Sequence, residues 1–452
     1  FSYLLSLQKK EQDMRKTKNI RLQILLLLLI PLTVKAQTDG VHISLTQAID
    51  SAILHNESLK QATYSARIAK ENSRGADAVF MPQVGLSYTG YFTNNPLNSF
   101  GFKLQQQSVE ATDFDPARLN NPGFNKDFVG QIEITQPIFN LDAIYQRSAA
   151  RNYSQMQEWS KKRQEEFLLF QVKKAYLEIQ LSYKNKEVLA SALKTADAFV
   201  TRAEDMYEHG LIQKADLLEA KVFQNKMRTD YQTALSNIMN ASDQLGFLMG
   251  KKPGLMYHVD AVQFDETRVQ PLSVNLRSDV AAYEAGLSAA TNQLRSDKMS
   301  LIPRINAFGN YQFNDVKPFR FNSDSYFAGI RLSWKIFSGT QDWHKIKASK
   351  LEQQKMISRL NETKSQAEVE YQKTRRQLTD LTFEVEQAES MVKQAEEALF
   401  IQTDRYSQGL STTPDLLRIQ NQLAQSGLMK EMVYFKKNLT IAYLAFLTST
   451  NE

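Results

Sequence analysis

The sequence contains no cysteine among its 452 residues. This absence excludes disulfide bonds, thiolate metal sites and a lipid-modified N-terminal cysteine. After residue 36 the chain also lacks an apolar run of the roughly 20 residues that a membrane-spanning helix needs. Histidine is scarce, and the five histidines show no metal-ligand spacing: His42, His55, His209, His258 and His344. No metal ligand is therefore predicted.

The chain has little net charge once its first residues are set aside. The formal charge is +6, from 55 basic and 49 acidic residues. Residues 1–36 hold seven Lys or Arg but only Glu11 and Asp13 as acidic residues. The remainder carries 48 basic (55 − 7) and 47 acidic (49 − 2) residues, a net charge of +1. Because no basic patch stands out, the composition argues against nucleic-acid binding.

Residues 14–36 have the composition of a secretory signal peptide. Four basic residues follow Met14, an apolar stretch covers 24–30, and Val34-Lys35-Ala36 forms a small-x-small cleavage site before Gln37. A membrane anchor is the alternative, but the apolar stretch is too short to span a bilayer. Residues 1–13 precede the first methionine and are interpreted as a gene-model extension. The mature chain is expected to begin at Gln37.

Two segments, 206–218 and 405–417, are near copies of each other and organise the whole sequence. Tyr207 and Tyr406 are 199 positions apart (406 − 207), as are Asp216 and Asp415 (415 − 216), and a Gly-Leu pair lies between them in each copy. Glycine after a helix tolerates a left-handed C′ conformation, and aspartate favours a helix start. Each segment is therefore predicted to be the tip of a helical hairpin. We predict a first structural repeat over 37–250, a linker or equatorial segment over 251–274, and a second repeat over 275–452.

Apolar residues at helical spacing predict long helices on both sides of each tip. The stretch from Leu141 to Glu208 alone would form a rod of about 100 Å at 1.5 Å per residue. A helix of this length is typical of a coiled coil or an extended bundle. The predicted helices are Ser44 to Phe80, Leu141 to Glu208, Ala215 to Met249, Leu276 to Ile302, Asp342 to Tyr406 and Asp415 to Leu447.

Four segments instead alternate apolar and polar residues, as half-buried strands do. They contain Val84 to Thr89, Phe128 to Phe139, Ile305 to Phe313 and Tyr326 to Ile336, and residues 93–127 are predicted to be a long loop. Aromatic residues lie toward the strand ends, as in the girdles of a transmembrane β-barrel, although a half-buried soluble sheet has the same period. Glu133, Arg331 and Lys335 among the polar positions suit a water-filled lumen. Because four strands cannot close a barrel and an open edge is forbidden in lipid, the chain must oligomerise.

The order helix, strand, strand, long helix, tip, helix, present twice, is similar to the TolC-type outer-membrane efflux protein family. The resemblance covers nearly all of residues 42–449. It is carried by Pro82 and Pro303 before the strands, by 137–139 and 336–338 after them, and by both Tyr-x-x-Gly-Leu tips. It implies a mixed α and membrane-β fold, internally duplicated. The expected homotrimer has a 12-stranded β-barrel in the outer membrane, with four strands per chain, continued by a long α-helical periplasmic barrel.

The resemblance also implies a function and partners. The chain would be the exit channel of a tripartite efflux or type I secretion system in a Gram-negative bacterium, conducting small molecules, ions or polypeptides. Its partners would be two further copies of itself, a periplasmic adaptor, an inner-membrane pump of the RND or ABC type, and outer-membrane lipid. No cofactor is implied. A trimeric coiled-coil surface protein with a structural or adhesive role is the alternative, although it does not account for the duplication with two return helices.

Candidate functional residues lie at the two tips. Gly210, Leu211, Gly409 and Leu410 are expected to receive the adaptor, with glycine letting a backbone approach and leucine serving as an apolar anchor; helix capping is the simpler role for the glycines. The resemblance places the periplasmic gate at Tyr406 with Asp216, and at Asp415 with Arg418.

For Asp415 and Arg418, a surface pair within one helix is the alternative to a gate. No catalytic residue is predicted. The segment Gly246-x-x-x-Gly250-Lys251-Lys252 is one residue short of a phosphate-binding loop and has lysine where Ser or Thr must bind magnesium.

Overall fold

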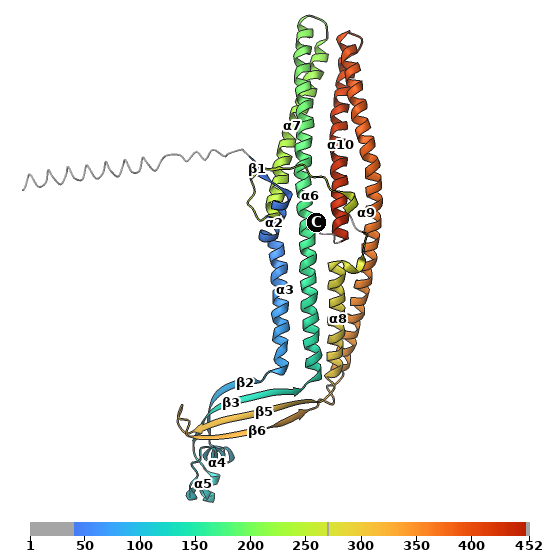
Figure 1. The fold of residues 1–452 in the computed structure, drawn as a ribbon. Coiled ribbons are helices and arrows are strands. Elements are labelled where there is room, and N and C mark those ends of the chain that lie inside the picture. The colour runs from blue at the N-terminus through green and yellow to red at the C-terminus, as the bar shows by residue number, and fades with distance from the viewer. Residues whose placement is uncertain (1–39, 269–270, 449–452) are drawn as a thin grey trace, which may run out of the picture.

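The computed structural model describes residues 40–268 and 271–448. The predicted signal peptide and the segment 1–13 lie outside the described residues. Long helices run side by side along one axis, and a four-stranded sheet lies across one end of them (Figure 1). The turns that join the helices in pairs lie at the opposite end (Figure 1).

The two long helices predicted from the sequence are present in the structure. Helix α6 spans Leu141–Glu208 with 68 residues, and α9 spans Gln341–Ser407 with 67 residues, about 100 Å each at 1.5 Å per residue. The return helices are α7, Lys214–Leu248, and α10, Thr413–Leu447. Helix α8, Ser278–Met299, lies against both α6 and α9. The predicted internal duplication is confirmed, since each half has strands followed by a long helix and a return helix.

The first predicted helix, from Ser44 to Phe80, is not continuous. It consists of α2, Leu45–His55, α3, Glu57–Gly75, and a 3₁₀ helix, Ala76–Phe80. The break lies at Asn56, whose buried side chain accepts a hydrogen bond from the Leu59 amide at 3.0 Å. Its amide nitrogen donates to the Leu248 carbonyl at the end of α7, also at 3.0 Å. Asn56 thus caps the start of one helix and the end of another, which periodicity alone did not reveal.

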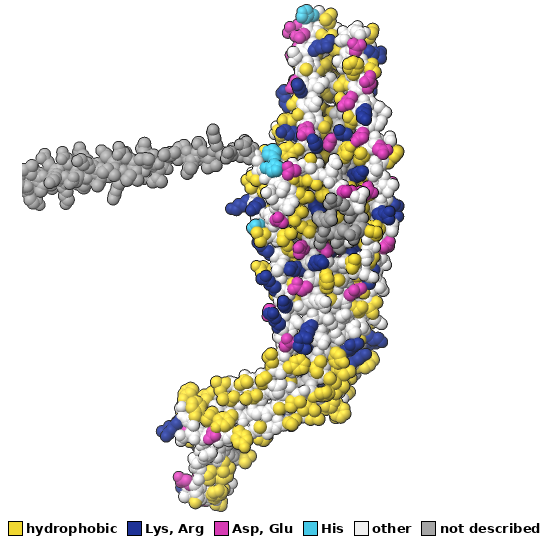
Figure 2. All heavy atoms as spheres, in the orientation of Figure 1, with side chains coloured by type: hydrophobic (Ala, Val, Ile, Leu, Met, Phe, Trp, Pro, Cys, Tyr) yellow, Lys and Arg dark blue, Asp and Glu magenta, His cyan; other side chains and the backbone are white. Residues whose placement is uncertain are grey.

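The sheet contains β2, Gln83–Thr93; β3, Asn125–Phe139; β5, Arg304–Asp315; and β6, Ser323–Ser333. All neighbours are antiparallel in the order β2-β3-β5-β6, so β2 and β6 are the edges. Hydrophobic side chains gather over the sheet, while charged side chains are spread along the helices (Figure 2). Strand β6 ends at Ser333, although the predicted alternation continues through Trp334 and Ile336.

The segment 93–127, predicted to be a long loop, contains helical structure beyond the sheet (Figure 1). Helix α4 spans Pro96–Gln105, a 3₁₀ helix spans Ala111–Phe114, and α5 spans Pro116–Asn120. Asn95 and Asp115 cap α4 and α5, and a proline follows each cap at the first helical position. Asx-Pro is a helix-start signal that the abundance of Asn, Pro and Gly in this segment concealed.

A two-stranded sheet and the segment that follows it pack against the helices near their middle. Strand β1, Val41–Ile43, pairs in parallel with β4, Tyr257–Val259, which lies in the segment predicted as a linker. The Tyr176 hydroxyl of α6 donates to the Ile43 carbonyl at 3.2 Å and accepts from the Asp260 amide at 2.8 Å. Two 3₁₀ turns, Glu266–Arg268 and Val274–Leu276, complete the connection to α8.

Candidate functional site at the helix tips

Both hairpin tips have the same backbone geometry. Helix α6 ends in a Schellman motif, in which the Gly210 amide donates to the Tyr207 carbonyl at 3.0 Å and the Leu211 amide to the Met206 carbonyl at 2.8 Å. Gly210 has φ +71°, in the left-handed region that favours glycine. At the end of α9, Gly409 also has φ +71°, and the two bonds recur with carbonyl acceptors at Tyr406 and Arg405.

These bonds establish the capping role of the two glycines. A Cβ atom added to either glycine would have no heavy atom within 4 Å, so each is required by its backbone conformation and not by a neighbour in this chain. The leucines that follow are exposed, Leu211 by 69% and Leu410 by 63%. Two apolar side chains therefore project from the tips with no intrachain cover.

Just behind the tips, an apolar cluster joins the two hairpins. The Phe199 ring of α6 and the Tyr406 ring of α9 have centroids 5.5 Å apart. Leucines from α7 and α10 pack around them, and all of these side chains are buried. We call this set the tip cluster: Phe199, Val200, Ala203, Leu217, Ala220, Tyr406, Leu416 and Leu417. Because its members come from both hairpins, the cluster resists their separation.

The structure does not bring Tyr406 and Asp216 together. The Tyr406 hydroxyl lies 3.2 Å from Thr413 Oγ1 at the start of α10, where both groups are buried. The Asp216 carboxylate accepts a bond from the Gln213 amide at 3.0 Å and so caps its own helix, α7. In the single chain, each group therefore has a nearer partner than the one the resemblance implied.

Asp415 likewise has a local role. Its carboxylate accepts a hydrogen bond from the Thr412 hydroxyl at 2.6 Å, and Thr412 caps α10. Arg418 is exposed, and within the described ranges no ion pair joins it to Asp415. The roles of Thr412 and Thr413 were not predicted, although Thr412-x-x-Asp415 is a recognisable helix-start motif. The Asp415 and Arg418 gate remains a prediction about the assembled protein.

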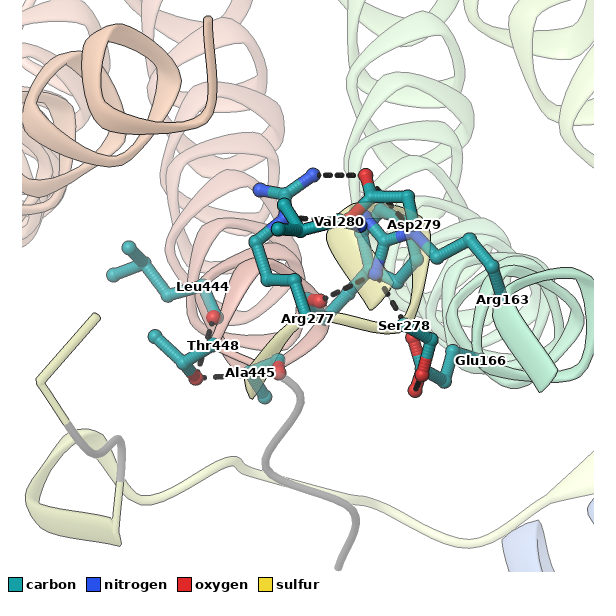
Figure 3. Close-up of polar contacts among 10 residues, drawn as sticks. Arg163, Glu166, Arg277, Ser278, Asp279, Val280, Leu444, Ala445 and Thr448 are labelled. Carbon is teal, nitrogen blue, oxygen red and sulfur yellow. Dashed lines mark hydrogen bonds and ion pairs between the residues drawn. The ribbon is translucent and has the colours of Figure 1, made fainter. Parts of the chain in front are cut away.

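A second polar site lies deep in the helical body, where α6, α8 and α10 meet (Figure 3). The Glu166 carboxylate, whose side chain is 3% exposed, accepts from the Ser278 hydroxyl at 2.6 Å and from Arg163 Nη1 at 3.0 Å. Arg163 Nη1 also donates to the Phe446 carbonyl at 3.2 Å, and its guanidinium carbon lies 3.7 Å from the centre of the Phe446 ring. This arrangement ties the end of α10 to α6.

The same cluster holds an arginine–aspartate pair at the start of α8. Arg277 donates to both carboxylate oxygens of Asp279, at 3.0 and 2.6 Å (Figure 3). Burial favours the neutral carboxyl group. The hydrogen bond from Arg277 and the positive charges of Arg163 and Arg277 outweigh that effect and lower the Asp279 pKa below its usual value. Asp279 is therefore ionised at neutral pH and holds its two arginines by charge.

The described residues give little support for a phosphate-binding or metal-binding site. The residue cluster resembling a phosphate-binding loop spans the C-terminal end of α7, and Gly250 occupies the left-handed C′ position there. Phosphate-binding loops precede a helix N-terminus, so this segment has the opposite polarity. Across residues 40–268 and 271–448, no group of His, Asp or Glu side chains could hold a metal ion. Within the same ranges, none of the helices has the length and apolarity needed to cross a membrane.

Solved structures share this architecture. CusC has a TM-score of 0.78 at 15% identity, with 93% of this chain and 95% of that chain covered. VceC of Vibrio cholerae has a TM-score of 0.76 at 20% identity, covering 89% and 96%. The CmeC outer membrane channel of Campylobacter jejuni has a TM-score of 0.78 at 15% identity, covering 89% and 85%. The fold is that of these outer-membrane channels.

Sequence comparison gives the family. A family model described as outer membrane efflux protein matches residues 48–251 and 272–451, which is most of the chain. The chain belongs to the outer membrane efflux protein family. Comparison of the sequence with curated proteins gives no match.

Proposed function

We propose that this chain forms the outer-membrane exit channel of a tripartite efflux or type I secretion system in a Gram-negative bacterium. The observation that carries the proposal is the separation of two features along the long helices. A sheet with an exposed apolar face lies at one end, and two hairpins joined by the tip cluster lie at the other. The sheet would lie in lipid, and the helices would extend through the periplasm toward the pump.

The proposed assembly is a homotrimer. A four-stranded sheet with unpaired edges β2 and β6 leaves backbone donors and acceptors that lipid does not satisfy. Three copies would give 12 strands and a closed barrel wide enough for a water-filled lumen, whereas two would give a barrel that side chains fill. The two repeats of each chain, 37–250 and 275–452, would each supply one strand pair and one hairpin.

The decisive test of channel function is conductance. The mature chain from Gln37, purified from outer membranes in detergent, should run as a trimer and produce ion-conducting steps in a planar bilayer. A structural or adhesive stalk would form the trimer without conductance. A monomer that still conducts would contradict barrel closure by three chains.

The exposed leucines at the tips are the proposed contact with the periplasmic adaptor. Leu211→Asp combined with Leu410→Asp should reduce export to the level of a strain lacking the channel, because each aspartate places a charge where an apolar anchor would be buried. Export would be measured as drug or metal resistance and as accumulation of a fluorescent substrate. The matched control is Leu54→Asp, since Leu54 is 68% exposed but lies at the end of α2, away from the tips.

The double tip variant and the Leu54→Asp control must both still form trimers and conduct ions, so that a loss of export can be assigned to docking. Retained export in the double tip variant would remove the docking role of the leucines. The two glycines would then keep only the capping role that their hydrogen bonds establish.

Asp415 and Arg418 are proposed to close the channel by charge pairing between chains at the tips. If so, Arg418→Ala and Asp415→Ala should each raise the open probability in a bilayer and the sensitivity of cells to large antibiotics. Asp415→Asn is the control for capping, because it keeps an acceptor for the Thr412 hydroxyl while removing the charge. Wild-type conductance and ion selectivity in all three variants would exclude a charge gate.

A further inference from the structure

The internal duplication can be aligned residue by residue in the sheet. Pro82 and Pro303, each just before a strand, are 221 positions apart (303 − 82). Ile138 and Ile336, each in an Ile-Phe pair after a strand, are 198 positions apart (336 − 138). A residue of β2 therefore corresponds to the residue 221 positions later in β5. A residue of β3 corresponds to the residue 198 positions later in β6.

The strand registers agree with this alignment. In the first hairpin, Gln83 faces Thr135, and the two offsets convert this pair into Arg304 and Ser333, which face each other in the second hairpin. The pair Leu86 and Ile132 becomes Ala307 and Ile330 in the same way, and these also face each other. The two hairpins thus repeat with no slip between them.

The two hairpins are joined inside the chain by the pairing of β3 with β5. We call this contact between the second strand of one repeat and the first strand of the other a seam. The second seam would pair β6 with β2, but those strands are the two opposite edges of one sheet. Only another copy of the chain can supply the missing partner. Applying the offsets to the facing residues Thr135 and Phe308 gives Ser333 and Ser87.

We propose that β6 of one chain pairs with β2 of the next copy in the register that places Ser333 opposite Ser87. The proposal rests on the homotrimer described above and adds the residues that form its seam. In this register Leu332 lies opposite Tyr88, and Ile330 lies opposite Gly90. The seam between chains would then repeat the seam within each chain at every strand pair.

The side chains on the two faces of the edge strands β2 and β6 agree with this register. On one face it brings together only apolar side chains and one glycine, and each of these apolar side chains is exposed in the single chain. On the other face it places Arg331 opposite Thr89, and Lys335 opposite Gly85. A one-residue slip would put apolar side chains opposite polar ones, which sheet pairing disfavours. The apolar pairs are Val84–Ile336, Leu86–Trp334, Tyr88–Leu332, Gly90–Ile330 and Phe92–Ala328.

The early end of β6 follows from the same missing partner. In β3, pairing with β2 stops at Thr135, and the residues from Gln136 to Phe139 are held as a strand by β5 alone. The equivalent residues of β6 are 334–337, whose partners would be in β2 of the next copy. In the single chain β6 ends at Ser333, where its own pairing with β5 ends. The predicted strand through Ile336 would therefore form only in the assembly.

The packing of the helices next to the sheet also predicts that the second repeat of one copy lies beside the first repeat of the next. A Cβ atom added to Gly286 of α8 would lie 3.0 Å from Met156 Sδ of α6 and 3.5 Å from Met356 Sδ of α9. Helix α8 is thus held between the two long helices. Its equivalent α3 contacts α6 but has no α9 beside it in the chain. The position equivalent to Gly286 is Ser65 (286 − 221), a small exposed residue. The offset of 198 converts Met156 into Gln354, so Gln354 on α9 of the next copy would face Ser65.

Disulfide mapping tests the register directly, because the sequence has no cysteine of its own. Ser87→Cys combined with Ser333→Cys should give a covalent trimer on a non-reducing gel after mild oxidation in the outer membrane. Within one chain these positions lie on opposite edges of the sheet, three strand spacings or about 14 Å apart across the strands. Ser333 also lies eight residues (333 − 325) along β6 from Ser325, the residue in the same row as Ser87, so the full separation is larger still. That is beyond the Cα separation of about 7 Å that a disulfide spans. Any bond between them must therefore join two chains.

Three further cysteine pairs serve as controls for the cross-link between Ser87 and Ser333. Thr135→Cys with Phe308→Cys is the equivalent pair within the chain, and should give an intrachain disulfide with unchanged trimer yield. Ser87→Cys with Arg331→Cys, and Ser87→Cys with Lys335→Cys, report slips of two residues on the same face. A trimer on native gels that cross-links only through a slipped pair would overturn the register while leaving the channel proposal intact. A protein with the intrachain bond but no trimer would overturn both.

Discussion

Replacing Tyr406 by alanine is expected to shift the channel strongly toward its open form. Tyr406 belongs to the second hairpin, yet it is buried against Phe199 of the first, with ring centroids 5.5 Å apart. Truncating a buried aromatic residue costs about 3–5 kcal/mol of packing free energy. Since about 1.4 kcal/mol changes an equilibrium tenfold, the closed form of each chain should lose two or more orders of magnitude relative to the open form. Single-channel recording in a planar bilayer measures this shift.

Tyr406→Phe separates the ring from the hydroxyl group. This variant keeps the contact with Phe199 but loses the bond to Thr413, which is worth about 1 kcal/mol. We therefore expect a small rise in open probability, well below that of Tyr406→Ala. If Tyr406→Ala conducts like the wild type while Asp415→Ala or Arg418→Ala opens the channel, charge pairing and not the tip cluster closes it.

Replacing Glu166 by alanine should cause the largest loss of stability among the charged positions considered. The Glu166 carboxylate holds Arg163 and Ser278, and Arg163 in turn contacts the Phe446 carbonyl at the end of α10. Breaking a buried ion pair costs about 3–5 kcal/mol. Because Arg163 keeps Asp279 as a second partner at 3.6 Å, the loss for Glu166→Ala is expected at the lower end of that range. The free energy of unfolding, from urea-induced loss of helical circular dichroism in detergent, should fall by that amount.

Glu187→Ala is the matched control on the same helix. Glu187 pairs with Lys184 at 2.8 Å, but its side chain is 64% exposed, and such pairs contribute at most a few tenths of a kcal/mol. The two variants thus remove the same functional group from α6 in buried and exposed surroundings. Equal and small effects would mean that water reaches the cluster and screens it.

The tip geometry could be predicted from the sequence because its signals are local. Glycine followed by leucine after a long helical stretch predicted the turns, and both glycines have the left-handed φ that the pattern requires. The partner of Tyr406 was not predictable in the same way. A hydroxyl group forms hydrogen bonds with the nearest suitable donor or acceptor. The packing of α9 against α10 places Thr413 beside the Tyr406 hydroxyl, while Asp216 bonds to the Gln213 amide instead.

The sequence by itself determined the features that repeat along the chain. Periodicity located the long helices and all four strands, and the spacing of the two tips revealed the duplication, because side-chain direction follows secondary structure over a few residues. Tertiary structure decided the features that depend on residues far apart. Asn56 breaks a helix because the end of α7 offers it a carbonyl 192 positions away. Glu166 meets Ser278 across 112 positions. Strand β6 ends at Ser333, where its pairing with β5 ends, and β2 lies at the opposite edge of the sheet. In the assembly we propose, β2 of the next copy would extend it.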